Sequence, residues 1–232
     1  MNVAIMQPYF LPYIGYFQLI RSVELFILYD NIKYTKKGWI NRNRILQNGK
    51  DIVFSLPLEN ASNSLTIGER RLARDFSRDK LINQIAGAYR RAPYFAATMP
   101  LVEQIVRHEQ TNLFLYLHNA ITRICDHLAI RTIIRTSSEI TIDHELKSQD
   151  KVLALCAAVG AKTYINAVGG TTLYAREAFN ERGIVLKFIQ SRAFSYVQFG
   201  DPFVPWLSII DVLMFNPQAD VRARIDSDFD LV

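Results

Sequence analysis

Short apolar runs and an amphipathic stretch alternate at the start of the chain. Residues 3–6 are apolar, the segment 15–22 has a helix-compatible composition that includes Phe17 and Leu19, and residues 25–30 return to strand character. Two strands this close in sequence, with a helix between them, are joined most economically by a right-handed crossover between parallel strands. The pattern therefore predicts the beginning of an α/β sheet.

The middle of the chain changes from strand-like to helical periodicity. The dipeptide Asn48-Gly49 lies between two β-like runs, a strong hairpin signal, and the second strand is expected in 51–58. From Asp79 the pattern is helical, and a long apolar stripe runs from Leu113 to Leu128. Residues 130–140 then read as a strand that enters a loop.

Further strand and helix signals alternate toward the C-terminus. We predict a helix from an N-cap at Ser148 to Gly160, a strand at 163–166, and a short helix ending at Gly183. A strand at 184–189 should follow, and the last ordered element should be a helix begun by Pro205, because proline is favoured in a first helical turn. The fold class predicted is α/β and Rossmann-like. It combines a mostly parallel sheet in the N-terminal part, a helical middle segment and further βα units toward the C-terminus.

Composition adds a domain count and a cellular setting. The 232 residues are 50% hydrophobic and contain no linker-like segment, so one α/β domain over residues 1–232 is expected. Cys125 and Cys156 are too few for a disulfide framework and should pack as free thiols in helices. No apolar run approaches the roughly 18 residues of a spanning helix, and no signal peptide is visible. We expect no transmembrane segment and a cytoplasmic location.

Charge and motif searches narrow the candidate partners. The net charge is +5, and the densest basic run, at 68–80, has acidic residues interleaved with its arginines. A solvated helical face explains that run best, a site for an anionic substrate comes second, and a nucleic-acid groove comes third for want of a recognised motif. There is no HExxH motif and no cysteine-rich metal spacing, so we predict no metal site, and no cofactor can be assigned.

The segment 7–16, QPYFLPYIGY, falls between the first strand and the first helix. In open α/β sheets ligands bind at that edge, and helix N-terminal amides can face an anion there. Tyr13 and Tyr16 are three apart and could present rings or hydroxyls on one side. The alternative, that they are half-buried packing residues, has about equal weight.

The tetrapeptide Tyr13-Ile14-Gly15-Tyr16 resembles, in position and spacing, the His-x-Gly-His signature of adenylyl-transferring α/β enzymes. Tyrosine replaces both histidines here, which removes the groups that stabilise a pentavalent phosphate. A similar fold is therefore better supported than a similar reaction.

A second group of polar and aromatic residues occupies 39–44. On a strand, Asn41 and Asn43 share one face while Arg42 and Arg44 take the other. Guanidinium groups suit phosphate or carboxylate, and Trp39 could stack on a sugar or base. An exposed edge strand guarded by charge is the alternative, but the density of Asn and Arg around one tryptophan favours a site.

Two weaker signals lie toward the C-terminus. Gly169 and Gly170 follow a strand and would suit an anion-cradling turn at a helix start, although an ordinary strand-to-helix turn is at least as compatible. Ser208 and Asp211 face together on an apolar helix, where a carboxylate needs partners. For Asp211 a structural ion pair is slightly favoured over catalysis.

Taken together, several segments resemble the WbqC-like protein family, in that family's order and over nearly the whole chain. The matching segments are MQPYFLPYIGYFQLI, NRNRI, AYRRAPYF, SSEI, LCAAVGAKTYIN with GGTTLY, and FVPWLSIIDVLMFN. Residues at motif positions are Gln7, Tyr9, Pro12, Gly15, Asn43, Arg44, Gly170, Tyr174, Ser208 and Asp211.

The resemblance implies a bacterial protein of O-antigen (lipopolysaccharide) or other surface-polysaccharide biosynthesis. Our leading hypothesis is a transferase that moves an acyl or aminoacyl group to the amine of a nucleotide-activated amino sugar, a small anionic substrate. Asp30, which ends the second predicted strand, or Asp211 would be the base or orienter. A non-catalytic scaffold of polysaccharide assembly and a nucleotidyltransferase-like enzyme are the alternatives, and a homo-oligomer is possible.

Overall fold

A six-stranded sheet organises the molecule in the computed structural model, which describes residues 1–200 and 202–232. The strand order is β5-β2-β1-β6-β7-β8, in which the first five strands are parallel and β8 is antiparallel to β7. The fold is therefore Rossmann-like α/β, as predicted. The strands are β1 (Asn2–Met6), β2 (Leu25–Leu28), β5 (Ile133–Thr136), β6 (Thr163–Ala167), β7 (Val185–Ser191) and β8 (Phe229–Leu231).

The central strands are apolar throughout because both faces of the sheet are covered. Side chains alternate across a strand, so Ala4 packs on one face while Val3 and Ile5 pack on the other. In β2 the same alternation separates Phe26 from Ile27. Each face thus has its own hydrophobic core.

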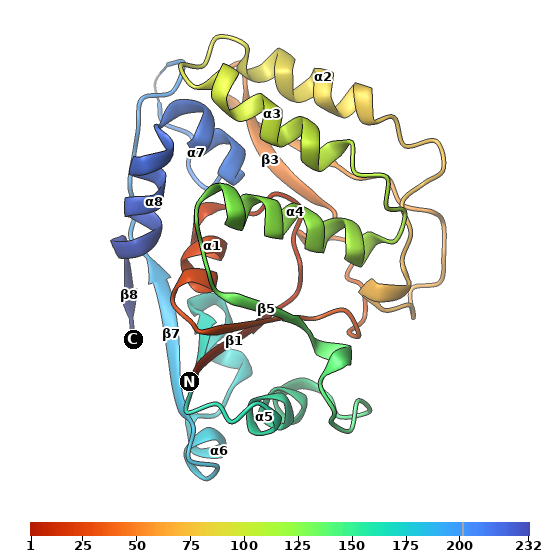
Figure 1. Ribbon diagram of the computed structural model, residues 1–232, viewed down its shortest axis with the longest axis vertical. Helices are drawn as coiled ribbons and strands as arrows, with labels where there is room; N and C mark the ends of the chain where they lie inside the picture. Colours follow the sequence, from red (N-terminus) through yellow and green to blue (C-terminus); the bar gives the residue numbers. More distant parts are fainter. Residues whose placement is uncertain (201) are drawn as a thin grey trace.

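Helices form the layers on either side of the sheet (Figure 1). The larger core contains residues of the N-terminal, middle and C-terminal helices, and the smaller core lies beneath the two helices that follow β5 and β6. The larger layer comprises α1 (Ile14–Arg21), α2 (Arg78–Tyr89), α3 (Phe95–Val106), α4 (Leu113–His127), α7 (Ile209–Phe215) and α8 (Gln218–Ser227). The smaller layer comprises α5 (Ser148–Ala158) and α6 (Arg176–Asn180).

A separate antiparallel hairpin joins β3 (Arg42–Gln47) to β4 (Lys50–Ser55). Its turn residues Asn48 and Gly49 have φ of 52° and 73°, as the predicted Asn-Gly turn requires. The Tyr89 hydroxyl of α2 accepts a hydrogen bond from the Leu46 amide at 2.9 Å, which fixes the hairpin against the helical layer.

Two predicted helix starts are wrong. Ser148 is the first residue of α5, with φ of 48°, and the cap position is Lys147. Pro205 begins no helix, because Trp206 after it has φ of 59° and residues 206–208 are not helical. The helix begins at Ile209 instead, where the Ser208 side chain caps it, and α8 and β8 still follow.

Other expectations hold. Gly160 ends α5 in the left-handed conformation, with φ of 68°. Cys125 and Cys156 are buried free thiols, and burial raises the pKa of each to about 12. Within residues 1–200 and 202–232, no helix has both the length and the apolarity needed to cross a membrane. The division into one domain stays a prediction.

Candidate functional site

The sheet reverses its direction of growth between β1 and β6. From β1 the chain continues to β2 on one side, and from β6 it continues to β7 on the other, so the loops that leave β1 and β6 diverge. A cavity of about 570 Å³ lies at this point. We call it the switch-point cleft. Its lining comes from the loop after β1, the turn after β6, the end of β7, and the side chains of Trp39 and Trp206.

The loop after β1 is held from behind by two polar side chains. The Asn43 amide donates to the carbonyl oxygens of Phe10 and Leu11 at 3.2 and 2.8 Å. The Ser208 hydroxyl donates to the Leu11 carbonyl oxygen at 2.7 Å. These bonds satisfy a buried loop whose Leu11 has φ of 45°, and they keep Tyr9 and Tyr13 at the cleft.

Gly15 serves side-chain packing and not the approach of a ligand. A Cβ atom at this position would lie 2.4 Å from Cε2 of Tyr13 and 2.5 Å from Oγ of Ser191. The Tyr13 ring therefore folds over the first turn of α1, next to the end of β7. Any side chain at residue 15 would push this ring out of place.

Tyrosine hydroxyls of the cleft are neutral hydrogen-bonding groups. Burial raises the pKa of Tyr9, Tyr13 and Tyr16, and the Tyr16 hydroxyl donates to the Gln7 carbonyl oxygen at 3.0 Å. Because their phenols stay protonated near neutral pH, these side chains can donate and accept hydrogen bonds but do not supply a base.

The opposite wall is a 3₁₀ turn, η3 (Val168–Leu173), after β6. Asn166 shapes it: its side-chain oxygen accepts from the Ala167 amide at 2.7 Å, and its amide donates to the Tyr174 hydroxyl at 3.2 Å. A Cβ atom at Gly170 would lie 3.1 Å from that same oxygen. Gly169, Gly170 and Tyr174 line the cleft, but the expected helix start at the glycine pair is wrong, since both lie inside the turn.

A smaller hollow of about 180 Å³ adjoins the cleft and shares Tyr9, Tyr13, Trp39 and Trp206 with it. Arg44 lines this hollow. Its guanidinium pairs with Asp51 at 3.0 Å and donates to the Trp206 carbonyl oxygen at 3.1 Å, while its buried Nε has no partner. We call it the arginine hollow.

Eight of the residues predicted for a site meet in the switch-point cleft. Two more line the arginine hollow. The cleft group is Gln7, Tyr9, Tyr13, Tyr16, Trp39, Gly169, Gly170 and Tyr174, and the hollow adds Asn43 and Arg44. That these residues bind a ligand stays a prediction.

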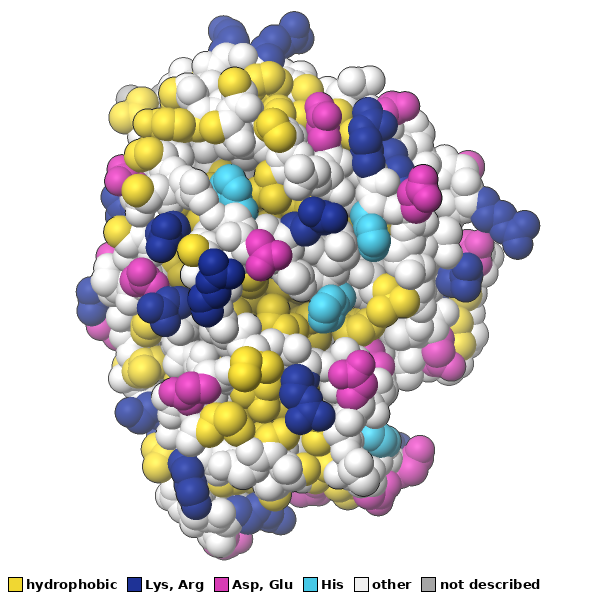
Figure 2. Space-filling model, viewed as in Figure 1, with side chains coloured by type: hydrophobic (Ala, Val, Ile, Leu, Met, Phe, Trp, Pro, Cys, Tyr) yellow, Lys and Arg dark blue, Asp and Glu magenta, His cyan; other side chains and the backbone are white. Residues whose placement is uncertain are grey.

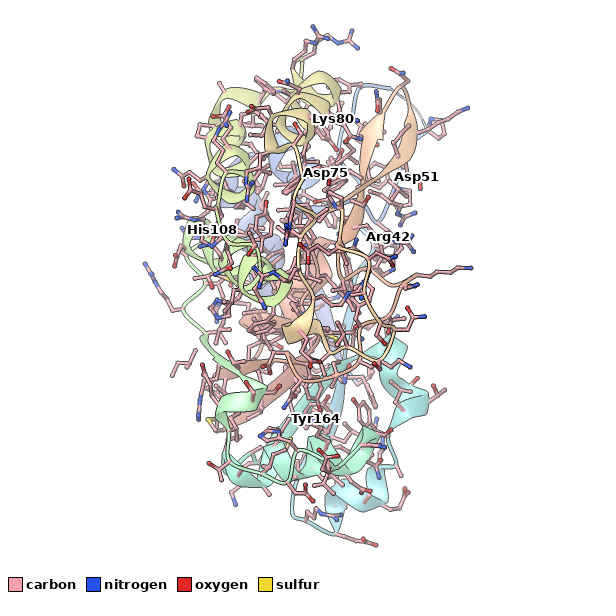
Figure 3. The ribbon with its side chains drawn as sticks, turned by 90° about the vertical axis from the view of Figure 1, so that its right-hand side faces the viewer. Arg42, Asp51, Asp75, Lys80, His108 and Tyr164 are labelled. Atoms are coloured by element: carbon pink, nitrogen blue, oxygen red, sulfur yellow. The ribbon has the colours of Figure 1, made fainter. Side chains whose placement is uncertain are left out.

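Three predicted residues lie outside these linings because their polar atoms hold the chain itself. The Asn41 side chain accepts from the Tyr34 hydroxyl at 2.8 Å and donates to the Leu56 carbonyl oxygen at 2.7 Å. Arg42, the first residue of β3 in the hairpin, donates to the Gly38 carbonyl oxygen at 3.0 Å and lies well away from Tyr164 (Figure 3). Asp30 accepts from the Ser137 hydroxyl at 2.8 Å and from the Ser138 amide at 3.0 Å.

The fourth predicted group, Ser208 and Asp211, is fully buried. Asp211 accepts hydrogen bonds from the hydroxyls of Tyr89 and Tyr196 and from the amide of Gln198. Burial raises the pKa of this carboxyl group, while the three hydrogen bonds act in the opposite direction. The structural ion pair expected for Asp211 is wrong, because neutral donors satisfy the carboxylate. We call these four residues, Asp211, Tyr89, Tyr196 and Gln198, the Asp211 cluster.

Several lining residues were missed by sequence reasoning. Trp206 lines the cleft and the arginine hollow, its side chain is 53% exposed, and its φ of 59° is a strained value for a bulky residue. It is one of only two tryptophans in the chain, and both line the cleft, which was the available signal. Ser191 and Gln190, at the end of β7, gave none.

The cleft is neutral, and that determines what it can recognise. None of the described residues that line it is charged; they offer aromatic and aliphatic side chains, amides, hydroxyls and backbone. On the face shown in Figure 2, Lys and Arg side chains are spread among Asp and Glu side chains. Among the described residues, no group of three His, Cys, Asp or Glu side chains could hold a metal ion. Aromatic faces with amide donors suit an uncharged polar ring, and Arg44 adds a cation at the edge.

Comparison with known proteins agrees with the sequence resemblance. The model of the WbqC-like protein family matches residues 7–223. The chain belongs to this family. This WbqC-like protein is also similar to "Uncharacterized protein Rv1507c" of Mycobacterium tuberculosis (strain ATCC 25618 / H37Rv), with 29% identity over 229 residues, covering 94% of this chain and 95% of that protein. No solved structure matches it.

Proposed function

We propose that this WbqC-like protein binds a nucleotide-activated amino sugar in the switch-point cleft and takes part in bacterial surface-polysaccharide synthesis, such as that of O-antigen. The observation that carries the proposal is the pairing of a neutral, aromatic and amide-lined cleft with Arg44 in the adjoining hollow. A nucleotide-activated sugar has two matching parts. Its sugar ring carries no negative charge and suits the neutral cleft, and its diphosphate is anionic and suits Arg44.

The sugar end fits the neutral part of the site. Trp39 is 41% exposed and Trp206 is 53% exposed, so both rings have free area on which a sugar ring can stack. Side-chain amides of Gln7 and Gln190 and the neutral hydroxyl of Tyr9 line the same cavity and can hydrogen-bond sugar hydroxyls.

The diphosphate end fits the arginine hollow and the backbone of the turn after β6. Arg44 lines this hollow and its side chain is 28% exposed, so its guanidinium can donate to a phosphate oxygen. Gly169 and Gly170, in the turn after β6, line the cleft and bring backbone close to a ligand.

Acyl transfer to the sugar amine remains the reaction that we propose, with an activated acyl donor. Neither Asp30 nor Asp211 is among the described residues lining the cleft, so the base expected from sequence has no support in the geometry. With a thioester donor, the amine nitrogen bonds to the carbonyl carbon, the carbon–sulfur bond breaks, and the proton lost by nitrogen ends on the departing sulfur. The chain would then act mainly by holding both substrates in line.

A non-catalytic role in polysaccharide assembly is the second candidate. It is favoured by one observation, that none of the described cleft residues is a carboxylate or a histidine. Incubation with nucleotide amino sugars and acyl thioesters, followed by mass spectrometry, separates the two functions. A product heavier by one acyl group supports transfer, and binding without any product supports the scaffold.

Titration calorimetry against a panel of uridine- and thymidine-diphosphate amino sugars tests the proposal itself. We expect at least one to bind, and the Arg44→Gln variant to weaken it about ten-fold through loss of a charge-assisted hydrogen bond. The matched control is Arg74→Gln, on an arginine whose side chain is 96% exposed. No binding by any member of the panel would contradict the proposal. A cytoplasmic location and self-association stay predictions.

A further inference from the structure

A second cavity, of about 410 Å³, lies next to the switch-point cleft. Its lining is mostly apolar and comes from the end of β7 and the segment that leads into α7. Its walls include Ala193, Phe194, Phe203, Pro205 and Val212. We call it the apolar pocket.

The apolar pocket and the cleft share one wall. Tyr13, Ser191 and Trp206 line both cavities. The rings of Tyr13 and Trp206 meet edge to face, with centroids 6.1 Å apart, at this boundary. A ligand group in one cavity is therefore next to a ligand group in the other.

The wall is held in a strained conformation. Trp206 keeps φ of 59° although it is half exposed, and its carbonyl oxygen accepts from Arg44. The Asp211 cluster supports the same segment: Gln198 bonds Asp211 at 2.9 Å and exchanges hydrogen bonds with both the amide and the carbonyl of Val204. Strain of this kind persists where the surroundings enforce it, and it is concentrated at binding sites.

Few polar groups of the pocket are free to bind a ligand. Its hydrogen-bonding or charged members are Tyr13, Ser191, Arg192, Ser195 and Tyr196. The Tyr196 hydroxyl donates to Asp211, and Arg192 is paired with Asp230. A mostly apolar lining with a few free polar groups matches a hydrocarbon tail attached to a polar carbonyl group. An ion or a free sugar would leave its polar atoms without partners in the interior.

We propose that the apolar pocket binds the hydrocarbon part of an acyl group, presented as a thioester, with its carbonyl carbon at the Tyr13–Trp206 wall. This inference rests on the proposed function, because the apolar pocket would hold the acyl donor of the transfer reaction proposed above. The acyl carbon and the sugar amine then meet where the two cavities adjoin, at Tyr13, Ser191 and Trp206, and the exchange of bonds is the one already given for a thioester donor.

The two tryptophans allow the two cavities to be followed separately. The Trp39→Phe variant leaves only Trp206, which lines both cavities, and the Trp206→Phe variant leaves only Trp39, which lines the cleft and not the apolar pocket. We would titrate the first with octanoyl-pantetheine, acetyl-pantetheine and pantetheine. The second would be titrated with the panel of nucleotide amino sugars.

We expect octanoyl-pantetheine to shift the fluorescence emission of Trp206 to shorter wavelength, and the shift to saturate with concentration. Octanoyl-pantetheine should bind at least about ten-fold more tightly than acetyl-pantetheine, because more methylene groups are buried. In the Trp39→Phe background, Ala193→Phe fills the pocket and should weaken octanoyl binding by about ten-fold. Ala219→Phe, on an exposed position of α8, should leave it unchanged.

Two results would overturn the inference. One is no saturable change at Trp206 with octanoyl-pantetheine while the sugar nucleotide still alters Trp39, which leaves the proposed function standing. The other is octanoyl binding that Ala193→Phe does not weaken, because the chain would then bind elsewhere. Loss of the sugar signal alone would count against the proposed function and not against the apolar pocket.

Discussion

The switch-point cleft and the Asp211 cluster contain similar residue types and differ in what those residues contact. In the cleft, tyrosines, amides and tryptophans border open space, and both tryptophans are about half exposed. In the cluster, Asp211 is fully buried and every hydrogen bond of its carboxylate is made within the protein. A polar side chain can recognise a ligand only if folding leaves its bonding capacity free.

The two regions are nevertheless connected. The cluster holds the segment that carries Trp206, through Gln198 and Val204, and Ser208 at the start of α7 bonds the loop after β1. The buried polar groups thus position the exposed ones. Predictions that disturb one region and measure the other test this division.

The largest effect should come from Asp211→Ala. Removal of the carboxylate leaves the hydroxyls of Tyr89 and Tyr196, and one of the two amide hydrogens of Gln198, without an acceptor in a buried place. We expect the free energy of unfolding to fall by about 3 kcal/mol, since each stranded donor costs on the order of 1 kcal/mol or more. Urea denaturation measures this. Asp220→Ala, exposed on α8, is the control, and equal stability of the two variants would refute the structural role of Asp211.

Gly15→Ala should damage the cleft and cost less stability. The new methyl group overlaps the Tyr13 ring and the Ser191 hydroxyl, so the ring must move. We expect a loss of about 1–2 kcal/mol from overpacking and about ten-fold weaker binding of the nucleotide amino sugar.

Gly87→Ala is the matched control for Gly15→Ala. Gly87 is exposed in the interior of α2, and a Cβ atom there meets nothing within 4 Å. Alanine should stabilise that helix by about 0.5–1 kcal/mol and leave binding unchanged. If both variants bound the ligand equally well, the Tyr13 position would be irrelevant to recognition.

Trp39→Ala should weaken ligand binding with little loss of stability, whereas Asp211→Ala is expected mainly to lower stability. Its ring is 41% exposed and lies near the guanidinium groups of Arg42 and Arg44, so little core packing is lost. We expect binding of the nucleotide amino sugar to weaken by about ten-fold, with a change in unfolding free energy below about 1 kcal/mol. Calorimetry and urea denaturation on the same sample check both numbers. A large loss of stability with unchanged affinity would place Trp39 in the structural group.

The smallest effect concerns pH. Burial lowers the pKa of His118 and His127, so the unfolded chain takes up these protons first as the pH falls. Their contribution to stability is complete above the unfolded value of about 6.5 and is lost progressively below it. The urea concentration at the midpoint of unfolding should therefore decrease as the pH is lowered from 7.5 to 5.5.

Histidine variants isolate this contribution, because the raised pKa of Asp211 acts with the opposite sign. His118→Gln with His127→Gln should flatten the decline. Affinity for an N-acetylated nucleotide sugar, which has no titrating amine, should stay nearly constant from pH 6 to 9, since burial keeps the phenols of Tyr9 and Tyr13 neutral. An affinity that rises or falls steeply in this range would show that a titrating group had been overlooked in the cleft.

Local pattern alone was enough for much of the fold and part of the site. Apolar runs bounded by turn signals marked the strands, the Asn48-Gly49 dipeptide specified its hairpin, and Gly160 marked the end of a helix, because each depends on neighbours in sequence. The loop 7–16 and the glycine pair were found for the same reason, since the end of a parallel strand is where ligands bind in this type of sheet.

Tertiary structure decided which polar residues remain free. Asn41, Asn43 and Arg44 are neighbours in sequence, yet Asn41 and Asn43 bond the protein's own backbone and Arg44 keeps an unpartnered nitrogen. Asp211 meets Tyr89 from 122 residues away, and no local pattern encodes that contact. The carbonyl oxygen of Trp206 accepts from Arg44, which is 162 residues away in the sequence. Periodicity reports burial along one element, whereas the partners of a buried or exposed polar atom are set by how the elements pack.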